Sequence, residues 1–401
     1  MSEPVLLTVD TVAGYLSREP ELAAGLDVEG GLSVLEVGDG NLNLVFLIED
    51  AAGRRVVLKQ SLPHVRTDPS WPMTRERTAR EVRILREHGR VDAEHVPALY
   101  GFDARNYVVA MEDLRDHNVW RRELIAGRVH PYAAEALGRY VAKVGFATSV
   151  FGLRGPDKRR LVAATVNPEL SEITEDLVFT EPYVEHPHNV VLAANEADVA
   201  ALREDGSLLR EIGLAKIRFQ DDAQSLLHGD LHTGSVLVRE SDESVRAFDA
   251  EFGAFGPTGF DLGAVWANLV IAAARAEALG ERTRAAVILG LPEQLWSAFE
   301  AEYRALWPAR IDPRVFGNEV LEGTIARIRS DAAVFAGAKA IRRVVGFAKA
   351  ADIESLDEDR REVAARAVLR AGRSLAVGRL DDDAPGNLTA HVAEILTTAR
   401  P

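Results

Sequence analysis

The pattern of hydrophobic and polar residues divides the chain into a strand-rich first part and a helical second part. Up to about residue 112, short β-rich runs alternate with turns, and one amphipathic helix is predicted from Glu76 to His88. The predicted strands are LSVLEVG, NLNLVFLIED, RRVVLKQ, ALYGFD and NYVVAMEDL. After Asp113 long helical patterns dominate, at 130–151, 263–279, 293–306, 335–353 and 360–377, with one β-like pair, SVLVRE and SVRAFDAEF, among them.

This order of elements predicts a bilobal α+β fold. An N-terminal antiparallel β-sheet lobe with one main helix precedes a C-terminal, mainly helical lobe. Because the segment MEDL marks the change of pattern, we expect the lobes to be residues 1–113 and 114–401.

Composition narrows the classes of function. Lys and Arg total 47 against 62 Asp and Glu, and the net charge of −15 argues against a general nucleic-acid binder. The chain has no cysteine, which excludes disulfides and thiolate metal sites. No uncharged apolar run approaches the roughly 18 residues of a membrane span, and MSEPVLLTVD lacks the pattern of a signal peptide. We expect a cytoplasmic protein that binds neither nucleic acid nor membrane.

Two polar clusters in the helical part are the first candidates for chemistry. The stretch HGDLHTGS holds His228, Asp230 and His232, which could alternatively be turn-forming or satisfied buried residues. It is followed by RAFDAEFGAFGPTGFDLG, where Asp249 and Glu251 are expected on one face of an extended segment. Paired carboxylates at a strand end suit Mg²⁺, whereas either one alone reads equally well as a solvated strand end. Together the clusters indicate a catalytic loop followed by a metal loop.

That order is typical of phosphoryl transfer, and the first lobe offers matching parts. An aspartate such as Asp230 orients the acceptor hydroxyl and takes its proton, while metal-bound carboxylates hold phosphates. GDGNLN could close over phosphates, although an Asp-Gly turn is usually only a turn. Lys59 ends an apolar strand and could grip phosphate, with Glu81 as its ion-pair partner; its alternative is a surface lysine. The backbone of MEDL could bind an adenine edge at the lobe junction.

A rival interpretation is a dinuclear metallophosphoesterase, because GDLH resembles one of the short motifs of those enzymes. They also need an upstream Asp-x-His and a downstream Gly-Asn-His. The single Asp-x-His in this chain is Asp230 to His232 itself, and no Gly-Asn-His follows. The sequence therefore offers too few of the ligand motifs that a two-metal site needs.

The chain resembles the 5-methylthioribose kinases, a branch of the aminoglycoside phosphotransferase and choline kinase superfamily. The motifs run in family order from Gly38 to Ile353: GDGNLNLVF, LKQSLPHVR, SWPMT, MEDL, NPELSEITEDLVFTEPY, HGDLHTGS, DAEFGAFGPTGFDLG and FAGAKAIRRVVGFAKAADI. Ser235 stands where the wider superfamily has a metal-binding asparagine, which gives more of the metal duty to Asp249 and Glu251. Ala250 stands where proline is expected, a change that affects loop stiffness rather than the metal.

The resemblance implies a protein-kinase-like fold, a homodimer, the cofactors ATP and Mg²⁺, and phosphorylation of 5-methylthioribose at O1 within methionine salvage. Asp230 is then the catalytic base, and Asp249 and Glu251 hold Mg²⁺ against ATP. The implied cofactor-binding residues are Asn43, Lys59, Glu112, Asp113, Leu114, Asp249, Ala250 and Glu251. The implied substrate-binding residues are Asp230, Trp71, Arg342 and Arg343. Asp261 is interpreted as a structural brace of the catalytic loop, and Met73 as an apolar anchor.

Two alternatives stay open at this stage. The substrate could be another small hydroxyl compound, such as an aminoglycoside, choline or homoserine, or the chain could be a catalytically inactive nucleotide-binding scaffold. The pair Arg342 and Arg343 favours an anionic partner over the cationic ones. Because adjacent helix positions point about 100° apart, the two arginines cannot easily share one role. We expect at least one of them beside Asp230, whereas the alternative is that both are structural.

Overall fold

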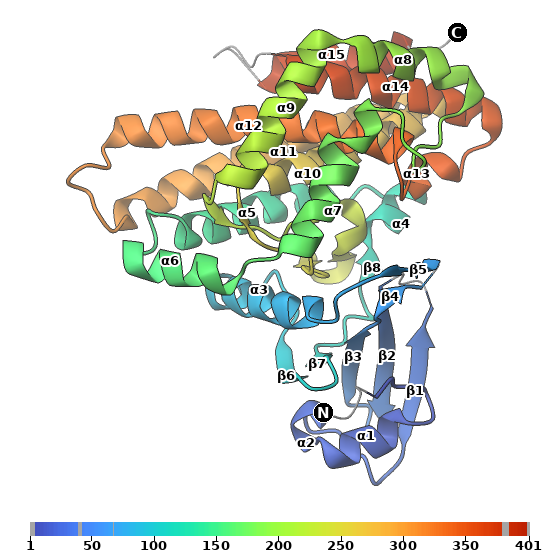
Figure 1. The fold of residues 1–401 in the computed structure, drawn as a ribbon, viewed down its shortest axis with the longest axis vertical. Coiled ribbons are helices and arrows are strands. Elements are labelled where there is room, and N and C mark those ends of the chain that lie inside the picture. Colours follow the sequence, from blue (N-terminus) through green and yellow to red (C-terminus); the bar gives the residue numbers. More distant parts are fainter. Residues whose placement is uncertain (1–4, 39–41, 67, 379–384, 399–401) are drawn as a thin grey trace.

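The computed structural model describes residues 5–38, 42–66, 68–378 and 385–398. The chain forms a small lobe that contains the main sheet and a larger lobe of helices (Figure 1). The bilobal α+β prediction is confirmed. The turn predicted at Gly38-Asp39-Gly40, and with it the middle of the GDGNLN segment, lies outside the described residues.

The strands are β1 Leu32–Val37, β2 Asn43–Asp50, β3 Arg55–Ser61, β4 His64–Val65, β5 Asp68–Pro72, β6 Leu99–Asp103, β7 Val108–Met111, β8 Asn118–Val119, β9 Ser225–Leu226, β10 Val236–Arg239, β11 Ser244–Ala247 and β12 Phe255–Gly256. The helices of the first lobe are α1 Val12–Arg18, α2 Pro20–Ala23 and α3 Arg77–Val91. The helices that follow are α4 Trp120–Ile125, α5 Tyr132–Thr148, α6 Gly155–Ala164, α7 Pro168–Phe179, α8 Glu196–Glu204 and α9 Gly206–Asp221. The last are α10 Gly259–Ala278, α11 Arg282–Leu306, α12 Asn318–Val345, α13 Ala351–Glu354, α14 Glu358–Val377 and α15 Pro385–Thr398.

The antiparallel sheet of the first lobe has the order β1-β2-β3-β7-β6, and each face buries a different layer. Phe46 and Leu58 pack against the α1–α2 side, whereas Val57 and Val109 pack with Val82 of α3. Lys59 pairs directly with Val109 in the ladder, so its side chain shares the α3 face. Strand alternation therefore delivers this lysine to the helix that carries Glu81.

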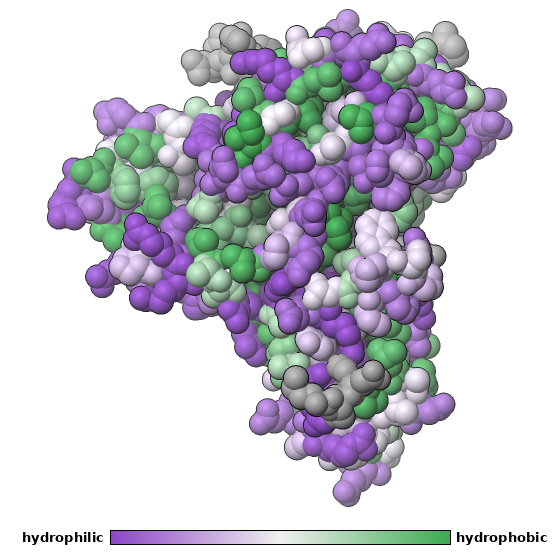
Figure 2. All heavy atoms as spheres, in the orientation of Figure 1, coloured by the Kyte–Doolittle hydropathy of each residue, from purple (hydrophilic) through white to green (hydrophobic). Residues whose placement is uncertain are grey.

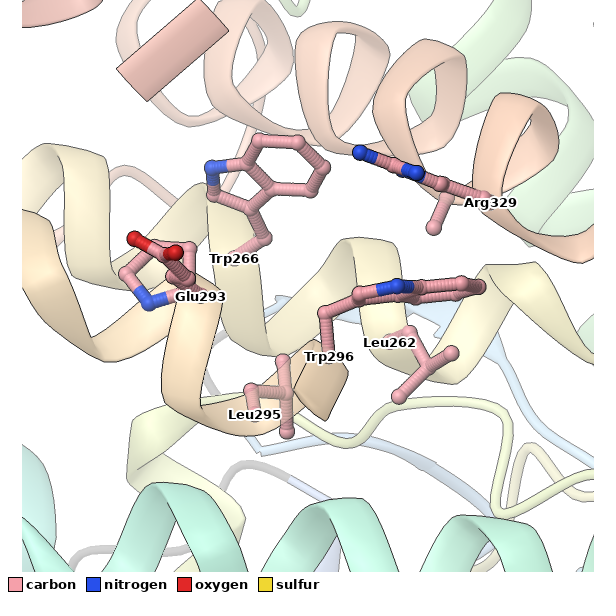
Figure 3. Close-up of a pocket in the computed structure, with 8 residues that line it drawn as sticks. Leu262, Trp266, Glu293, Leu295, Trp296 and Arg329 are labelled. Atoms are coloured by element: carbon pink, nitrogen blue, oxygen red, sulfur yellow. The ribbon is translucent and has the colours of Figure 1, made fainter. Parts of the chain in front are cut away.

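The helical lobe is built around α10, which packs against α11, α12 and α14. Gly259 and Gly263 let the backbones of α10 and α12 approach closely, since a Cβ on Gly263 would stand 2.7 Å from the carbonyl oxygen of Ala332. A small pocket at the contact of α10, α11 and α12 is lined by Trp266, Trp296 and Arg329 among others (Figure 3). The Arg329 guanidinium lies 5.6 Å from the centre of the Trp296 ring, which it covers.

Several elements differ from the sequence predictions. The helix predicted at 335–353 begins already at Asn318 and ends at Val345. The sequence pattern missed its beginning because the first turns carry many charges and the small residues hide the helical period. The helix predicted at 293–306 begins at Arg282 and passes through Pro292. Helices α6 to α9, of 9 to 16 residues, were not predicted. Helices α7, α8 and α9 bury apolar residues in the lobe, whereas α6 buries none.

The surface agrees with the acidic, polar composition. On the face seen in Figure 2, hydrophilic residues dominate and hydrophobic residues form smaller patches among them. Among the described residues, none of the helices combines the length and the apolar character needed to cross a bilayer.

Substitution Gly263→Ala should lower the free energy of unfolding by about 1–3 kcal/mol, because the added methyl group overpacks the α10–α12 contact. The matched control is Gly290→Ala in α11, where no atom lies within 4 Å of the new Cβ. There the gain in helix propensity should stabilise the fold by up to about 1 kcal/mol. Urea unfolding measures both values, and equal stabilities for the two variants would contradict the close helix contact.

Candidate active site

The loop after β9 presents Asp230 and is held from behind by a buried carboxylate. Asp261, in the first turn of α10, accepts the backbone N–H groups of His228 at 2.7 Å and Gly229 at 3.0 Å. Gly229 has φ +85°, and a Cβ there would stand 2.2 Å from the carbonyl oxygen of Phe252. Only glycine fits this position, because it tolerates the positive φ and leaves room for the Phe252 carbonyl. Asp261 thus lies where the bracing interpretation expected it.

His228 connects this loop to the next one. Its Nε2 atom lies 3.0 Å from the carbonyl oxygen of Phe248, directly before Asp249. Burial lowers the pKa of His228, with Asp261 and Asp230 acting in the opposite direction. A neutral ring donating from Nε2 satisfies this carbonyl, so one side chain ties the Asp230 and Asp249 loops together.

The Asp230 carboxylate, about a quarter exposed, is surrounded by donors and cations. His232 Nε2 lies 3.3 Å from Oδ2, while Lys339 Nζ and Arg343 Nη2 lie 3.6 Å and 3.9 Å from Oδ1. Burial by itself would raise the pKa of Asp230, but His232, Lys339 and Arg343 outweigh it and hold that pKa well below its usual value. Asp230 is therefore an ionised carboxylate with one oxygen on the histidine and the other facing the cations.

The two adjacent arginines near the end of α12 have different surroundings. Arg342 Nη1 donates to the carbonyl oxygen of Phe347 at 3.2 Å, and Arg343 Nη1 donates to that of Ala348 at 2.8 Å. Arg343 also approaches Asp230, as described above. Both arginines therefore shape the chain after the helix, and Arg343 adds positive charge beside the candidate base.

The expected extended segment at Asp249 and Glu251 was wrong. Strand β11 ends at Ala247, and Asp249 has φ 68°, in the left-handed region that non-glycine residues seldom adopt. The two carboxylates consequently have different surroundings. Asp249 is about two-fifths exposed and contacts Lys59, whereas Glu251 is buried and its Oε2 lies 3.2 Å from both Asn43 Nδ2 and Arg77 Nε.

Lys59, Arg77, Glu81, Asp249 and Glu251 form a charge cluster between the lobes. Lys59 Nζ lies 2.8 Å from Glu81 Oε1, as the sequence predicted, and it reaches Asp249 on its other side. Two cationic side chains thus face three carboxyl groups. Burial and the neighbouring carboxylates raise the pKa of Glu81 to about 7 and raise that of Glu251.

This cluster fits a divalent cation. Carboxylate oxygens are the ligands that Mg²⁺ prefers. Asp249 is the more exposed of the two predicted ligands, and Lys59 holds its pKa below the usual value against the effect of burial. The buried Oε2 atom of Glu81 has no hydrogen-bond partner, so the cluster has an acceptor to spare. A bound cation would favour the ionised form of these carboxyl groups. Ala250, between the two carboxylates, is fully buried and has no polar side-chain atom to offer a metal.

The segment expected to bind adenine follows β7. Glu112 N donates to Ala98 O at 2.8 Å, and the Glu112 side chain accepts from Ala98 N at 3.0 Å. Asp113 pairs with Arg115, while Leu114 is buried and its carbonyl accepts from His117 N at 2.9 Å. Because these side chains have structural partners, any recognition of adenine here would use the backbone.

Trp71 of β5 belongs to an aromatic cluster with His188 and Phe347. Its ring stacks on His188 with centres 5.5 Å apart, and Phe347 lies 5.6 Å away at 49°. His188 Nδ1 is fixed by Glu181 Oε1 at 3.0 Å. Met73, in contrast, is buried with apolar neighbours, as the anchor interpretation expected. The cluster adjoins the candidate base through α12, because Arg342 and Arg343 bind the chain at Phe347 and its neighbour.

Sequence reasoning missed several residues of this site. Lys339 had a usable signal, since it precedes Arg343 by one helical turn and shares its face. Arg77 is one of several arginines in a charged helix, and nothing in the pattern marks it as fully buried. His188 and Phe347 lie in irregular segments far apart in sequence, so only the tertiary structure brings them to Trp71.

The chain is similar to known proteins over most of its length. Residues 33–295 match the phosphotransferase enzyme family. A methylthioribose kinase from Klebsiella pneumoniae subsp. pneumoniae is 41% identical over 380 residues, covering 92% of this chain and 95% of the relative. One from Yersinia pseudotuberculosis serotype O:3 is 38% identical over 403 residues, covering 98% of both.

Among solved structures, a glucosamine kinase in complex with glucosamine, ADP and inorganic phosphate covers 96% of this chain and 89% of its own. The two structures have a TM-score of 0.48, and their sequences are 13% identical.

Substitution Lys339→Met should change how stability depends on pH. Burial lowers the pKa of Lys339 from 10.5 to about 8, with Asp230 opposing the shift and Arg342 and Arg343 adding to it. Between these values the unfolded chain binds more protons, so the stability of the unsubstituted protein rises with pH. Urea unfolding at about pH 7 and about pH 9.5 measures the free energy of unfolding of both proteins. The value of the unsubstituted protein minus that of the variant should therefore be larger at about pH 9.5 than at about pH 7. A flat or opposite trend would mean that Lys339 does not titrate in this range.

The family assignment rests on sequence: with two relatives matched over more than nine-tenths of its length, the chain belongs to the methylthioribose kinases of the phosphotransferase enzyme family.

Proposed function

We propose that this chain transfers the γ-phosphoryl group of ATP to O1 of 5-methylthioribose, giving 5-methylthioribose 1-phosphate and ADP in methionine salvage. The observation that carries the proposal is an ionised aspartate on a clamped loop, bordered by cations and adjacent to a lysine–carboxylate cluster. The relatives named above, which carry this activity in their names, support the same substrate.

The residues divide the reaction between them. The Asp230 carboxylate takes the proton of the O1 hydroxyl as O1 bonds to the γ-phosphorus, and the bond to the β–γ bridging oxygen breaks to release ADP. Lys59, steadied by Glu81, binds phosphate oxygens. Arg343 offers a fork of donors that stabilises the charge developing on the transferred group.

Asp249 and Glu251 are the proposed ligands of Mg²⁺, which when bound neutralises phosphate charge. Asn43, the first residue of β2, contacts Glu251 and is proposed to lie beside the phosphates. The backbone of residues 112–114 is proposed as the adenine hinge, and with it a lobe boundary between residues 113 and 114.

The shape and charge of the site favour a neutral sugar with an apolar substituent. Lys339 and Arg343 make the surroundings of Asp230 cationic, which disfavours choline and aminoglycosides. The rings of Trp71, His188 and Phe347 offer an apolar wall for the methylthio group, since sulfur contacts aromatic rings favourably.

We place the enzyme in the cytoplasm, where ATP is available. We also propose that it is a homodimer, and light scattering after size-exclusion chromatography tests this oligomeric state.

An ATP-consumption screen tests the substrate assignment. Methylthioribose, ribose, choline, homoserine and an aminoglycoside are compared side by side with purified enzyme and Mg²⁺. Methylthioribose should give the highest kcat/KM. If it were inert while another alcohol turned over, the enzyme would be a kinase of that other compound. If none turned over although ATP bound, the chain would be a nucleotide-binding scaffold.

Asp230→Asn should retain ATP binding but reduce kcat at least about 10²-fold, the lower end of general-base contributions. The matched control is Asp359→Asn on the exposed face of α14, which should leave kcat unchanged. ATP affinity is measured by calorimetry and kcat by a coupled ADP assay. Turnover of Asp230→Asn near that of the control would place the base elsewhere.

Trp71→Ala should reduce kcat/KM for methylthioribose about ten-fold or more, because the methylthio group loses apolar and sulfur–aromatic contact. With ribose, which lacks that group, kcat/KM should change much less. Ribose is thus the internal control for damage to the fold. An equal loss with both sugars would remove Trp71 from the recognition of the methylthio group.

A further inference from the structure

Three side chains of the catalytic loop lie in a row: Ser235 is hydrogen-bonded to His232, and His232 in turn makes an ion-pair contact with Asp230. His232 Nε2 lies 3.3 Å from Asp230 Oδ2, and His232 Nδ1 lies 3.1 Å from Ser235 Oγ. Ser235 is buried and the His232 side chain is only 15% exposed, so water competes little for either contact. The contacts along these three side chains therefore run in one donor-to-acceptor direction once the hydrogen positions are assigned.

The chemistry of the three groups leaves one assignment. An ionised carboxylate can only accept, so Nε2 of His232 must carry the hydrogen that faces Asp230. Burial, opposed by Asp230, lowers the pKa of His232 to about 4, which keeps the ring neutral around pH 7. In a neutral imidazole the other nitrogen, Nδ1, is an acceptor. The Ser235 hydroxyl is the donor within reach of it.

The backbone is shaped around this arrangement. A Cβ on Gly234 would stand 2.8 Å from His232 Cε1 and 3.0 Å from Nδ1, so the ring packs directly on that glycine. Ser235 N donates to His232 O at 2.8 Å, and Ser235 O accepts from Phe248 N at 3.0 Å. The hydroxyl is thereby fixed between the histidine and the loop that carries Asp249.

We propose that Ser235 is a positioning residue: its hydroxyl holds Nδ1 of His232, which keeps the Nε2–H donor on Asp230 Oδ2 and fixes the rotation of the carboxylate. Oδ1 then points to the side where Lys339 and Arg343 lie and is left to receive the proton of the acceptor hydroxyl. In this arrangement the serine acts through the histidine on the base, not as a replacement for a magnesium-binding amide. The catalytic part of the inference rests on the proposed function, whereas the row of contacts does not.

The row of contacts is tested without substrate by ¹⁵N NMR of histidine-labelled protein. His232→Gln identifies the His232 signals among the ten histidines. The unsubstituted protein should show a neutral His232 with hydrogen on Nε2 and a hydrogen-bonded Nδ1. In Ser235→Ala the Nδ1 shift should move to the value of an acceptor without a donor, and Ser235→Thr should preserve it. Hydrogen on Nδ1 in the unsubstituted protein would overturn the inference, and so would an unchanged Nδ1 shift in Ser235→Ala.

Kinetics on the same variants separate positioning from metal binding. Ser235→Ala should lose about ten- to a hundred-fold in kcat, since a misplacement of about 1 Å can cost about 10² in rate. Its KM for ATP and its Mg²⁺ requirement should stay unchanged, and Ser235→Thr should retain most of kcat. An unchanged kcat, or a raised Mg²⁺ requirement, would overturn the positioning role. If methylthioribose proves inert while the NMR result holds, the proposed function falls and the row of contacts stands.

Discussion

The structure depends on charges that are buried where the two lobes meet. Lys59 stands between Glu81 of its own lobe and Asp249 of the other, and Arg77 reaches across to Glu251. Removing one partner of any of these pairs would leave the other charge uncompensated in a site with little water. The free-energy cost of that unpaired charge is far larger than the net stabilisation that the pair provides. The ion pairs that connect the lobes thus lie where Mg²⁺ and phosphate are proposed to bind.

Around this cluster the fold restricts the reacting groups to single orientations. Asp261 fixes the backbone ahead of Asp230, and His228 ties that loop to the one carrying Asp249. Asp261 lies on α10 and Lys339 lies on α12, so the close packing of these two helices brings the two side chains near each other. The position of the Asp230 loop is therefore set by buried backbone contacts, and a small displacement of α10 would reach Asp230 directly.

The sequence predicted the parts of this arrangement that follow local rules. Strand alternation and a helix after β3 are local features, so the Lys59–Glu81 pair was predictable. The left-handed conformation of Asp249 was not, because aspartate adopts it only occasionally and nothing in the strand-like pattern RAFDAEF marks it. Arg77 and the cluster around Trp71 depend on contacts between segments far apart along the chain. Helix α9 was missed although its buried Leu208, Ile212 and Ala215 recur at helical spacing, whereas α6, which buries no residue, carries no such signal.

If Asp230 activates the anomeric hydroxyl of a methylthio sugar, as proposed, the new phosphate must lie on O1. The product formed from methylthioribose, ATP and Mg²⁺ is examined by two-dimensional ¹H–³¹P NMR. One phosphorylated sugar is expected, and its phosphorus should couple to the anomeric proton H1. Coupling to H2 or H3 in place of H1, or ATP hydrolysis to free phosphate without any sugar phosphate, would contradict the proposal.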